Sequence, residues 1–267
     1  ARELVDDELW EIVQPLLPVR RRRKMHPGRK PLDDRRVLTG ILFVLQSGIP
    51  WEMLPQEMGC GSGMTCWRRV RAWQKAGVWR KLHRVLLDKL RGADKLDFSR
   101  VVADSSSVGL YMGEKKWTEP TDRRKAGSKH HILVDAQGIP VNVILTKANR
   151  HDVTQLLPLV DGVHPIRGKR GRPLKKPKSV QADRAYDSRV HRLALEQRGI
   201  DHQIAKRRTA HGSNLGKTRW VVERTIAWLH QFRRLRVRYE RLPSIHEAFL
   251  HLGCAHICWR ILKNSFC

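Results

Sequence analysis

The 267-residue sequence has few acidic residues and no long apolar run. It contains 26 Asp and Glu against 53 Lys and Arg, which gives a net charge of +27. No segment approaches the ~18 consecutive apolar residues that a transmembrane helix needs. Residues 1–8 also lack the apolar core of a signal peptide. We therefore expect a cytoplasmic protein without membrane association, with one large domain or two modest ones.

Cysteine is also scarce, with five residues in the whole chain. An odd number of cysteines in a chain of this size argues against a disulfide framework. Cys254 and Cys258 lie four residues apart, near His251 and His256, and this spacing leaves a zinc site as an alternative. The stretch is apolar and has no second ligand pair at zinc-finger spacing, so we interpret both cysteines as buried thiols.

Positive charge is abundant and extends along the whole chain, with an isoelectric point near 10.9. Such a distribution predicts binding to phosphate backbones that weakens steeply as salt rises. Charge alone leaves ribosome association or simple solubility as alternatives. Residues 19–31 form a basic Pro/Gly linker in which Arg29 and Lys30 are candidate DNA contacts, the alternative being a solvated linker.

The first third of the chain predicts a small all-α domain. Apolar residues at helical spacing predict helices at 3–17, 33–47, 64–75 and 78–90, with a short helix at 49–55. The helix at 64–75, capped by Ser62 or Thr65, is basic, and the outline is that of a helix-turn-helix. On that helix Arg68, Arg69 and Arg71 are expected to face DNA, while Val70 and Trp73, together with Trp79 of the next helix, pack inward. A purely structural helical domain is the alternative.

The rest of the chain alternates strand and helix patterns. Strands rich in Val and Ile are predicted at 100–104, 130–135, 140–146, 179–183 and 200–204. An antiparallel three-stranded start, a crossover helix and two further strands give the ribonuclease H-like α/β fold with a mixed five-stranded sheet. We expect a helical DNA-binding domain at 1–92 and a catalytic domain at 93–267.

Three carboxylates stand out within this second part. Asp104 and Asp183 close the first and fourth strands, and Glu223 lies in a strongly helical stretch. The fold places the first strand in the centre and the fourth beside it, which would bring both aspartates together under the helix of Glu223. Such a trio suits two divalent metal ions and phosphodiester chemistry.

Structural alternatives exist for each carboxylate. Asp104 and Asp183 could cap helices, and Glu223 could pair with neighbouring arginines. Asp187 is a rival to Asp183, although its position past the strand end favours a cap for the next helix, and Asp135 is interpreted as structural.

Five motifs in order resemble the DDE transposases of bacterial insertion sequences, in the four/five superfamily with a compact N-terminal helical domain. They are Val101-Val-Ala-Asp-Ser-Ser-Ser-Val, Lys129-His-His-Ile-Leu-Val-Asp-Ala-Gln-Gly-Ile-Pro, Ala148-Asn-Arg-His-Asp, Ala182-Asp-Arg-Ala-Tyr-Asp-Ser and Arg219-Trp-Val-Val-Glu-Arg-Thr. The resemblance covers nearly the whole chain.

The resemblance implies that Asp104, Asp183 and Glu223 hold two Mg²⁺ ions, with Mn²⁺ as a substitute. It also implies a transposase that binds terminal inverted repeats, hydrolyses the 3′ ends of the element and joins them to target DNA. Because two ends are joined, a homodimer or larger assembly on double-stranded DNA is expected, at the bacterial nucleoid.

The resemblance also bears on basic residues around the site. Arg219 matches the arginine that the family often carries four residues before the glutamate, but Gly216 replaces the expected tyrosine. His230 stands where a basic residue is expected, with Arg233 and Arg234 as substitutes. Further candidate DNA contacts near the site are Lys129, His130, Arg184 and Arg224.

Two rival functions remain from the residues. One is a catalytically inactive DNA-binding protein derived from a transposase, which would have no need to keep all three carboxylates. The other is a ribonuclease H-like nuclease, which would not need the N-terminal helices.

Overall fold

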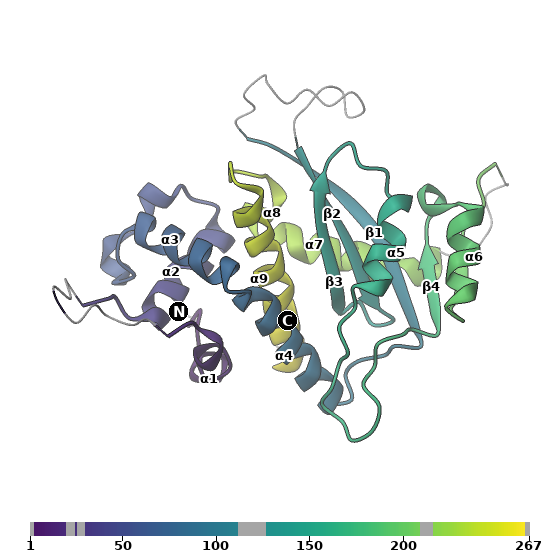
Figure 1. The fold of residues 1–267 in the computed structure, drawn as a ribbon. Coiled ribbons are helices and arrows are strands. Elements are labelled where there is room, and N and C mark those ends of the chain that lie inside the picture. Colours follow the sequence, from purple (N-terminus) through teal and green to yellow (C-terminus); the bar gives the residue numbers. More distant parts are fainter. Residues whose placement is uncertain (1–2, 20–24, 26–29, 112–126, 209–215, 265–267) are drawn as a thin grey trace.

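A five-stranded mixed sheet forms the centre of the part of the protein that follows the N-terminal helices (Figure 1). The computed structural model describes residues 3–19, 25, 30–111, 127–208 and 216–264. The strand order is β3-β2-β1-β4-β5, with β1 central, and this is the predicted ribonuclease H-like topology. The strands are β1 Arg100–Gly109, β2 Gly127–Asp135, β3 Pro140–Lys147, β4 Ser179–Ala182 and β5 Asp201–Ile204.

The pairing directions also match the predicted fold. Strands β1, β2 and β3 pair antiparallel, whereas β4 lies parallel to β1 and β5 lies parallel to β4. One boundary was predicted wrongly, because β1 continues past Asp104 to Gly109. The three serines after Asp104 do not end the strand, since β2 continues to pair with them as far as Ser107↔Lys129 and beyond.

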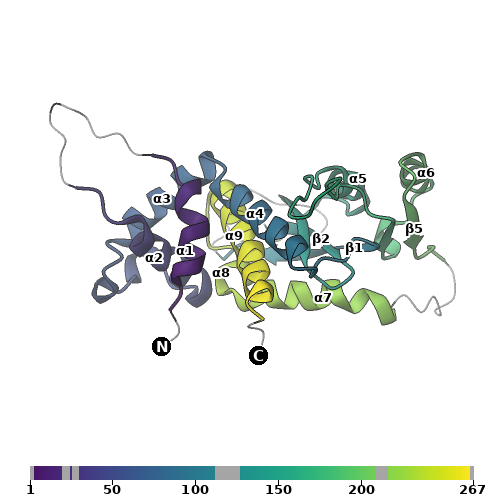
Figure 2. The same cartoon turned by 90° about the horizontal axis from the view of Figure 1, so that it is seen from below.

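Helices cover both faces of this sheet. Figure 2 shows α5 Val153–Asp161 and α6 Arg189–Gln197 on one side and α7 Gly216–Gln231 on the other. The short helix α8 Arg233–Arg236 and the long helix α9 Pro243–Leu262 follow α7. A side-chain hydrogen bond from Thr225 to the carbonyl of Gly138, at 2.6 Å, fixes α7 to the β2–β3 hairpin.

The N-terminal part is helical, as predicted, with α1 Asp7–Val13, α2 Asp34–Ser47, α3 Gly63–Lys75 and α4 Val78–Gly92. The hydroxyl of Ser62 accepts a hydrogen bond from the Thr65 amide and caps α3. The expected short helix at 49–55 is instead two 3₁₀ turns, Trp51–Met53 and Gln56–Met58. Pro50 and Pro55 precede the two turns, and the missing N–H of Pro55 prevents one continuous helix.

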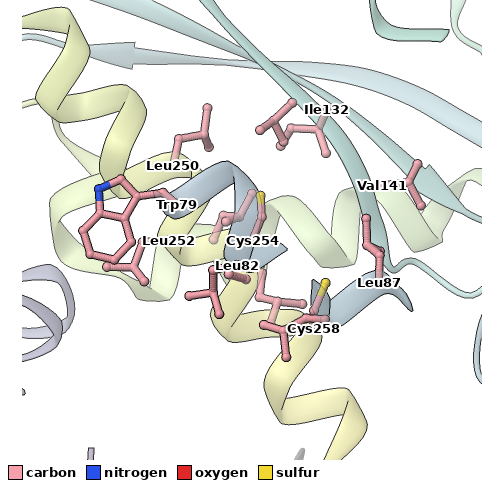
Figure 3. Close-up of a cluster of buried hydrophobic side chains, with 14 of the residues drawn as sticks. Trp79, Leu82, Leu87, Ile132, Val141, Leu250, Leu252, Cys254 and Cys258 are labelled. Carbon is pink, nitrogen blue, oxygen red and sulfur yellow. The ribbon is translucent and has the colours of Figure 1, made fainter. Parts of the chain in front are cut away.

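The helical part and the sheet share one hydrophobic core. Helices α4 and α9 lie side by side between α1–α3 and the sheet (Figure 1), and Figure 3 shows Leu82 and Leu87 of α4 near Val141 of β3 and Cys258 of α9. The domain boundary at 92 stays a prediction, because side chains from both parts make up this core.

The cysteines of α9 belong to the same core. Cys254 and Cys258 are fully buried, and burial raises the pKa of both thiols. Their interpretation as buried thiols is therefore confirmed. Among the described residues, no helix combines the length and the apolar character of a membrane span.

Several histidines are held neutral in the core. The Nε2 atom of His83 lies 2.7 Å from the Pro140 carbonyl oxygen, and His130 and His246 are joined through their Nε2 atoms at 2.8 Å. Burial lowers the pKa of His83 to about 4 and that of His246 to about 3. Each of these side chains therefore resists protonation in the folded state.

The buried histidines are expected to contribute a loss of stability as the pH drops from about 6.5 towards 4. The unfolded chain binds protons on these histidines in this range and the folded chain does not, which costs about 1.4 kcal/mol per pH unit for each one. A His83→Gln variant keeps a donor for the Pro140 carbonyl. Its free energy of unfolding should depend less steeply on pH than that of the wild type, by the contribution of one proton. Urea unfolding between pH 7.5 and 4.5 measures this. The exposed His151→Gln variant should keep the wild-type slope, and equal slopes in all three proteins would contradict the prediction.

Candidate active site

The parallel pairing of β1 with β4 places Asp104 beside Asp183. The last paired residues are Val102 and Gln181, and each aspartate lies two positions further along the chain. Strand β4 ends at Ala182, so Asp183 lies where the chain leaves the sheet. Its Oδ1 atom accepts the Ala185 amide at 2.9 Å and caps a 3₁₀ turn. The cap alternative is therefore realised for one oxygen, while Oδ2 has no hydrogen-bond partner among the described residues.

Asp104 is mostly buried and paired with Arg219. Its Oδ1 atom accepts the Ser105 amide at 2.8 Å, and its Oδ2 atom lies 3.2 Å from the Arg219 guanidinium. Burial raises the pKa of Asp104 to about 6, and the charges of Asp183 and Glu223 act in the same direction against Ser105 and Arg219. Asp183 and Glu223 therefore both lie within electrostatic reach of Asp104.

Glu223 lies on α7 one turn after Arg219 and is exposed. It forms no ion pair with any described side chain, so the alternative in which it pairs with neighbouring arginines is not supported. Arg224 turns away, donates to the Gln137 carbonyl and stacks 4.6 Å from the rings of both Trp220 and Trp228. Glu223 thus keeps its carboxylate oxygens available.

The oxygen donors suit Mg²⁺, which prefers carboxylates and water. Three negative charges oppose the one Arg219 guanidinium, which leaves a local excess that a cation would neutralise. Among the described residues, however, no three His, Cys, Asp or Glu side chains are drawn together tightly enough to enclose a metal ion. The carboxylate oxygens are suitable ligands for a divalent metal ion, but in this structure the three side chains are not close enough together to enclose one.

Two predicted DNA contacts are wrong because their side chains are buried. Arg69 is 3% exposed and pairs with Asp34 of α2, so it holds α2 and α3 together. His130 is fully buried against His246 of α9 and carries no positive charge, since burial lowers its pKa well below its usual value. Neither can reach a phosphate.

The remaining candidates in the helical part are placed differently. Arg68 and Arg71 are exposed on α3, with Arg71 lying over the Trp67 ring. Trp73 and Trp79 are buried as predicted. Lys30 is exposed, while Arg29 lies outside the described residues.

Around the carboxylates, Arg219 is ion-paired with Asp104, and Arg184 is half-buried in the turn that follows Asp183. Burial lowers the pKa of His230, so this residue does not supply the expected positive charge. Arg234 cannot substitute for it, because this side chain is 3% exposed and bound to Glu240. Arg233 is exposed.

The structural interpretation of Asp135 is confirmed, whereas the expected helix cap by Asp187 is wrong. Asp135 is fully buried and accepts three backbone amides of the strand ends and hairpin, from Asp97, Gln137 and Ile139. Asp187 is bound to Arg192 at 2.7 Å and to the Arg207 amide at 2.7 Å, but Ser188, not Asp187, stands at the N-cap of α6.

Sequence reasoning missed two residues beside the site. Asp152 stands at the start of α5, yet its side chain makes no cap bond and instead accepts the Ser105 hydroxyl at 2.7 Å and pairs with Lys129 at 3.1 Å. Arg207 donates to the carbonyls of Arg184 and Ala185. The motif Ala148-Asn-Arg-His-Asp was visible in the sequence, but nothing in it showed which strand Asp152 would meet.

The fold and the carboxylates together define a ribonuclease H-like protein of the DDE class. Residues 95–258 match the family described as "Transposase DDE domain", and residues 5–83 match "Putative transposase of IS4/5 family". The chain belongs to the DDE transposase family and is an enzyme of that class. Membership implies that its reaction depends on a divalent metal ion.

Similar proteins carry related names. The chain is 58% identical over 176 residues to "Putative transposase for insertion sequence element IS402" from Burkholderia cepacia, which covers 65% of this chain and 82% of that protein. It is 30% identical over 163 residues to "Transposase for insertion sequence element IS1106" from Neisseria meningitidis serogroup B, covering 57% of this chain and about half (52%) of that relative.

Solved structures resemble the chain more distantly. The Mos1 strand transfer complex shares 11% identity with a TM-score of 0.36, covering 89% of this chain and 78% of that one. A simian T-cell lymphotropic virus intasome shares 16% identity with a TM-score of 0.37, covering 58% and 48%.

Replacing Arg219 with Gln is expected to lower the stability of the metal-free protein at pH 8 by about 1.5–3 kcal/mol, the usual worth of a hydrogen bond to a charged group. The penalty should shrink as the pH falls through about 6, because Asp104 then becomes protonated and no longer needs the guanidinium. Denaturant unfolding in the presence of a chelator measures this.

The matched control is the same substitution in an Asp104→Asn background. There the Arg219→Gln penalty should be largely absent at every pH. A penalty that is unchanged by pH or by Asp104→Asn would mean that Arg219 stabilises the fold through other contacts.

Proposed function

We propose that this transposase binds the terminal inverted repeats of its insertion sequence, hydrolyses the DNA 3′ ends and joins them to target DNA. The observation that carries the proposal is the placement of Asp104 and Asp183 at the same level of two parallel strands, with the charge of Glu223 acting on Asp104. Family membership supplies the class of reaction, and this geometry supports the three carboxylates as its residues.

Asp104, Asp183 and Glu223 are the residues that would hold two Mg²⁺ ions, with Mn²⁺ as a substitute. Bound there, the ions would activate the attacking oxygen and stabilise the leaving oxygen. The chain orients the ligands: the Ser105 amide and Arg219 fix the carboxylate of Asp104, and the Ala185 amide fixes that of Asp183.

DNA would lie along the basic surface of the protein. The net charge of +27 supplies a sequence-independent attraction to phosphates. In the helical part, Lys30, Arg68 and Arg71 are exposed and available for contacts with an element end. Two element ends must be joined, so a homodimer or larger assembly on the DNA is part of the proposal.

An assay of cleavage and strand transfer tests the reaction. The substrate is the DNA that flanks the gene, incubated with wild-type protein in Mg²⁺, in Mn²⁺ or with a chelator. We expect metal-dependent nicking at the edges of an inverted repeat. Asp183→Asn should lose activity by about 100-fold or more, the usual cost of removing one group that stabilises transition-state charge.

The exposed Asp201→Asn variant on β5 is the matched control and should cut like the wild type. Normal cutting by Asp183→Asn would refute the assignment, and loss of cutting in Asp187→Asn alone would move it to Asp187. Tight, salt-sensitive binding without any cutting by the wild type would favour an inactive DNA-binding protein. Cutting of branched or hybrid duplexes without preference for the repeat would favour a nuclease.

Metal binding can be measured without DNA. Mn²⁺ at millimolar concentration is expected to raise the melting temperature of the wild-type protein, because a ligand bound only by the folded state stabilises it. The rise should be smaller in Asp183→Asn and unchanged in Asp201→Asn. Equal shifts in all three proteins would show that the metal binds elsewhere.

A further inference from the structure

The two faces of β1 carry different contacts from Asp104 onward, because successive side chains of a strand point to opposite faces of the sheet. Asp104 contacts Arg219 of α7, and the Ser106 hydroxyl lies 3.2 Å from Nε2 of His230 on the same helix. Ser105 instead bonds to Asp152 at the start of α5, on the other face (Figure 2). Strand β1 therefore carries the carboxylate site on one face and a second set of polar contacts on the other.

A pocket of about 220 Å³ lies on the α5 face, beside Ser107 and Lys129. Its wall also includes the segment 148–153, Ala185 and Arg207. Among the described residues that line it, Lys129, Arg150 and Arg207 are cationic and Asp152 alone carries a carboxylate. A concave surface with an excess of one charge focuses the field on a ligand of opposite sign.

Arg207 is held in place at the rim of this pocket. Its Nε and Nη2 atoms donate to the carbonyls of Arg184 and Ala185 at 3.0 and 3.2 Å. Its Nη1 atom has no hydrogen-bond partner in the part of the chain that the structure describes. Ala185 also donates its amide to Asp183, so one turn fixes both Arg207 and a carboxylate of the candidate active site.

Lys129 has a different role. Its ammonium group donates to the Arg150 carbonyl at 3.0 Å and pairs with Asp152 at 3.1 Å, so its charge is largely used inside the protein. It is a positioning residue that fixes the segment carrying Arg150. The exposed side chains of Arg150 and Arg207 are left to meet a ligand.

We propose that this pocket binds a phosphodiester group of a DNA strand that passes from the α5 face over β1 to the carboxylates, with Arg150 and Arg207 as its ligands. This rests on the proposed function. Ser107 lies three residues beyond Asp104, which is about 10 Å along a strand, so one DNA strand that rounds this edge of the sheet could contact both the pocket and the carboxylates. No Trp, Tyr or Phe lines the pocket among the described residues, which favours a phosphate over a stacked base.

The test compares the salt dependence of DNA binding for wild type, Arg207→Gln and Arg189→Gln. Arg189 is an exposed arginine of α6 that does not line the pocket, so it is the matched control. Fluorescence anisotropy is measured in chelator with duplexes from the DNA that flanks the gene and with unrelated duplexes. We expect Arg207→Gln to lower the slope of log K against log salt by about 1, as for one lost phosphate contact, and Arg189→Gln to leave it unchanged.

The same change in slope for both variants, or no change for Arg207→Gln with either kind of duplex, would overturn the proposal. Arg150→Gln provides a second variant should Arg207→Gln fail to fold, which a thermal melt reveals. Binding is measured under conditions in which the protein does not cleave DNA, so the two proposals can fail separately. If Arg207→Gln lowers the slope as expected but the wild-type protein never cuts DNA in the cleavage assay, only the proposed function is refuted.

The strand in the pocket can belong to the element end or to the target. If it belongs to the element end, Arg207→Gln weakens binding to flanking DNA and reduces 3′ cleavage. If it belongs to the target, Arg207→Gln loses strand transfer, and the change in slope appears with the unrelated duplexes. Either result supports the pocket as a phosphate site.

Discussion

The parallel register between β1 and β4 is the constraint on which the candidate active site depends. It sets Asp104 and Asp183 at the same level, two residues past the last paired positions. Like charges brought together in this way oppose one another, and the charge of Asp183 contributes to the raised pKa of Asp104. The arrangement persists because the sheet and the Arg219 guanidinium hold it, so the site is biased towards binding cations.

Packing between elements that are distant in the sequence holds the sheet and α7 in place around the carboxylates. Helix α7 is fixed to the β2–β3 hairpin through Thr225, and α9 packs against both α4 and β3. Helix α9 therefore joins the N-terminal helices to the catalytic sheet.

The sequence was sufficient to predict all five strands, because apolar periodicity is a local pattern. The succession of strands and helices then indicated the fold, and the fold predicted the proximity of Asp104 and Asp183. It was insufficient for the environments of Arg69 and His130. Their partners, Asp34 and His246, lie 35 and 116 residues away, and only the folded chain brings them together. The continuation of β1 through three serines was missed for the same reason, since β2 supplies the pairing.

The alternation of side chains along β1 connects these observations. Asp104 and Ser106 face α7, while Ser105 and Ser107 face α5 and the pocket, so a run of small polar residues serves both faces. Bulky apolar side chains at these positions would fill the space beside the carboxylates and the pocket. If a DNA strand crosses this edge as proposed, the small hydroxylated residues after Asp104 leave it the space and the hydrogen-bonding groups that it requires.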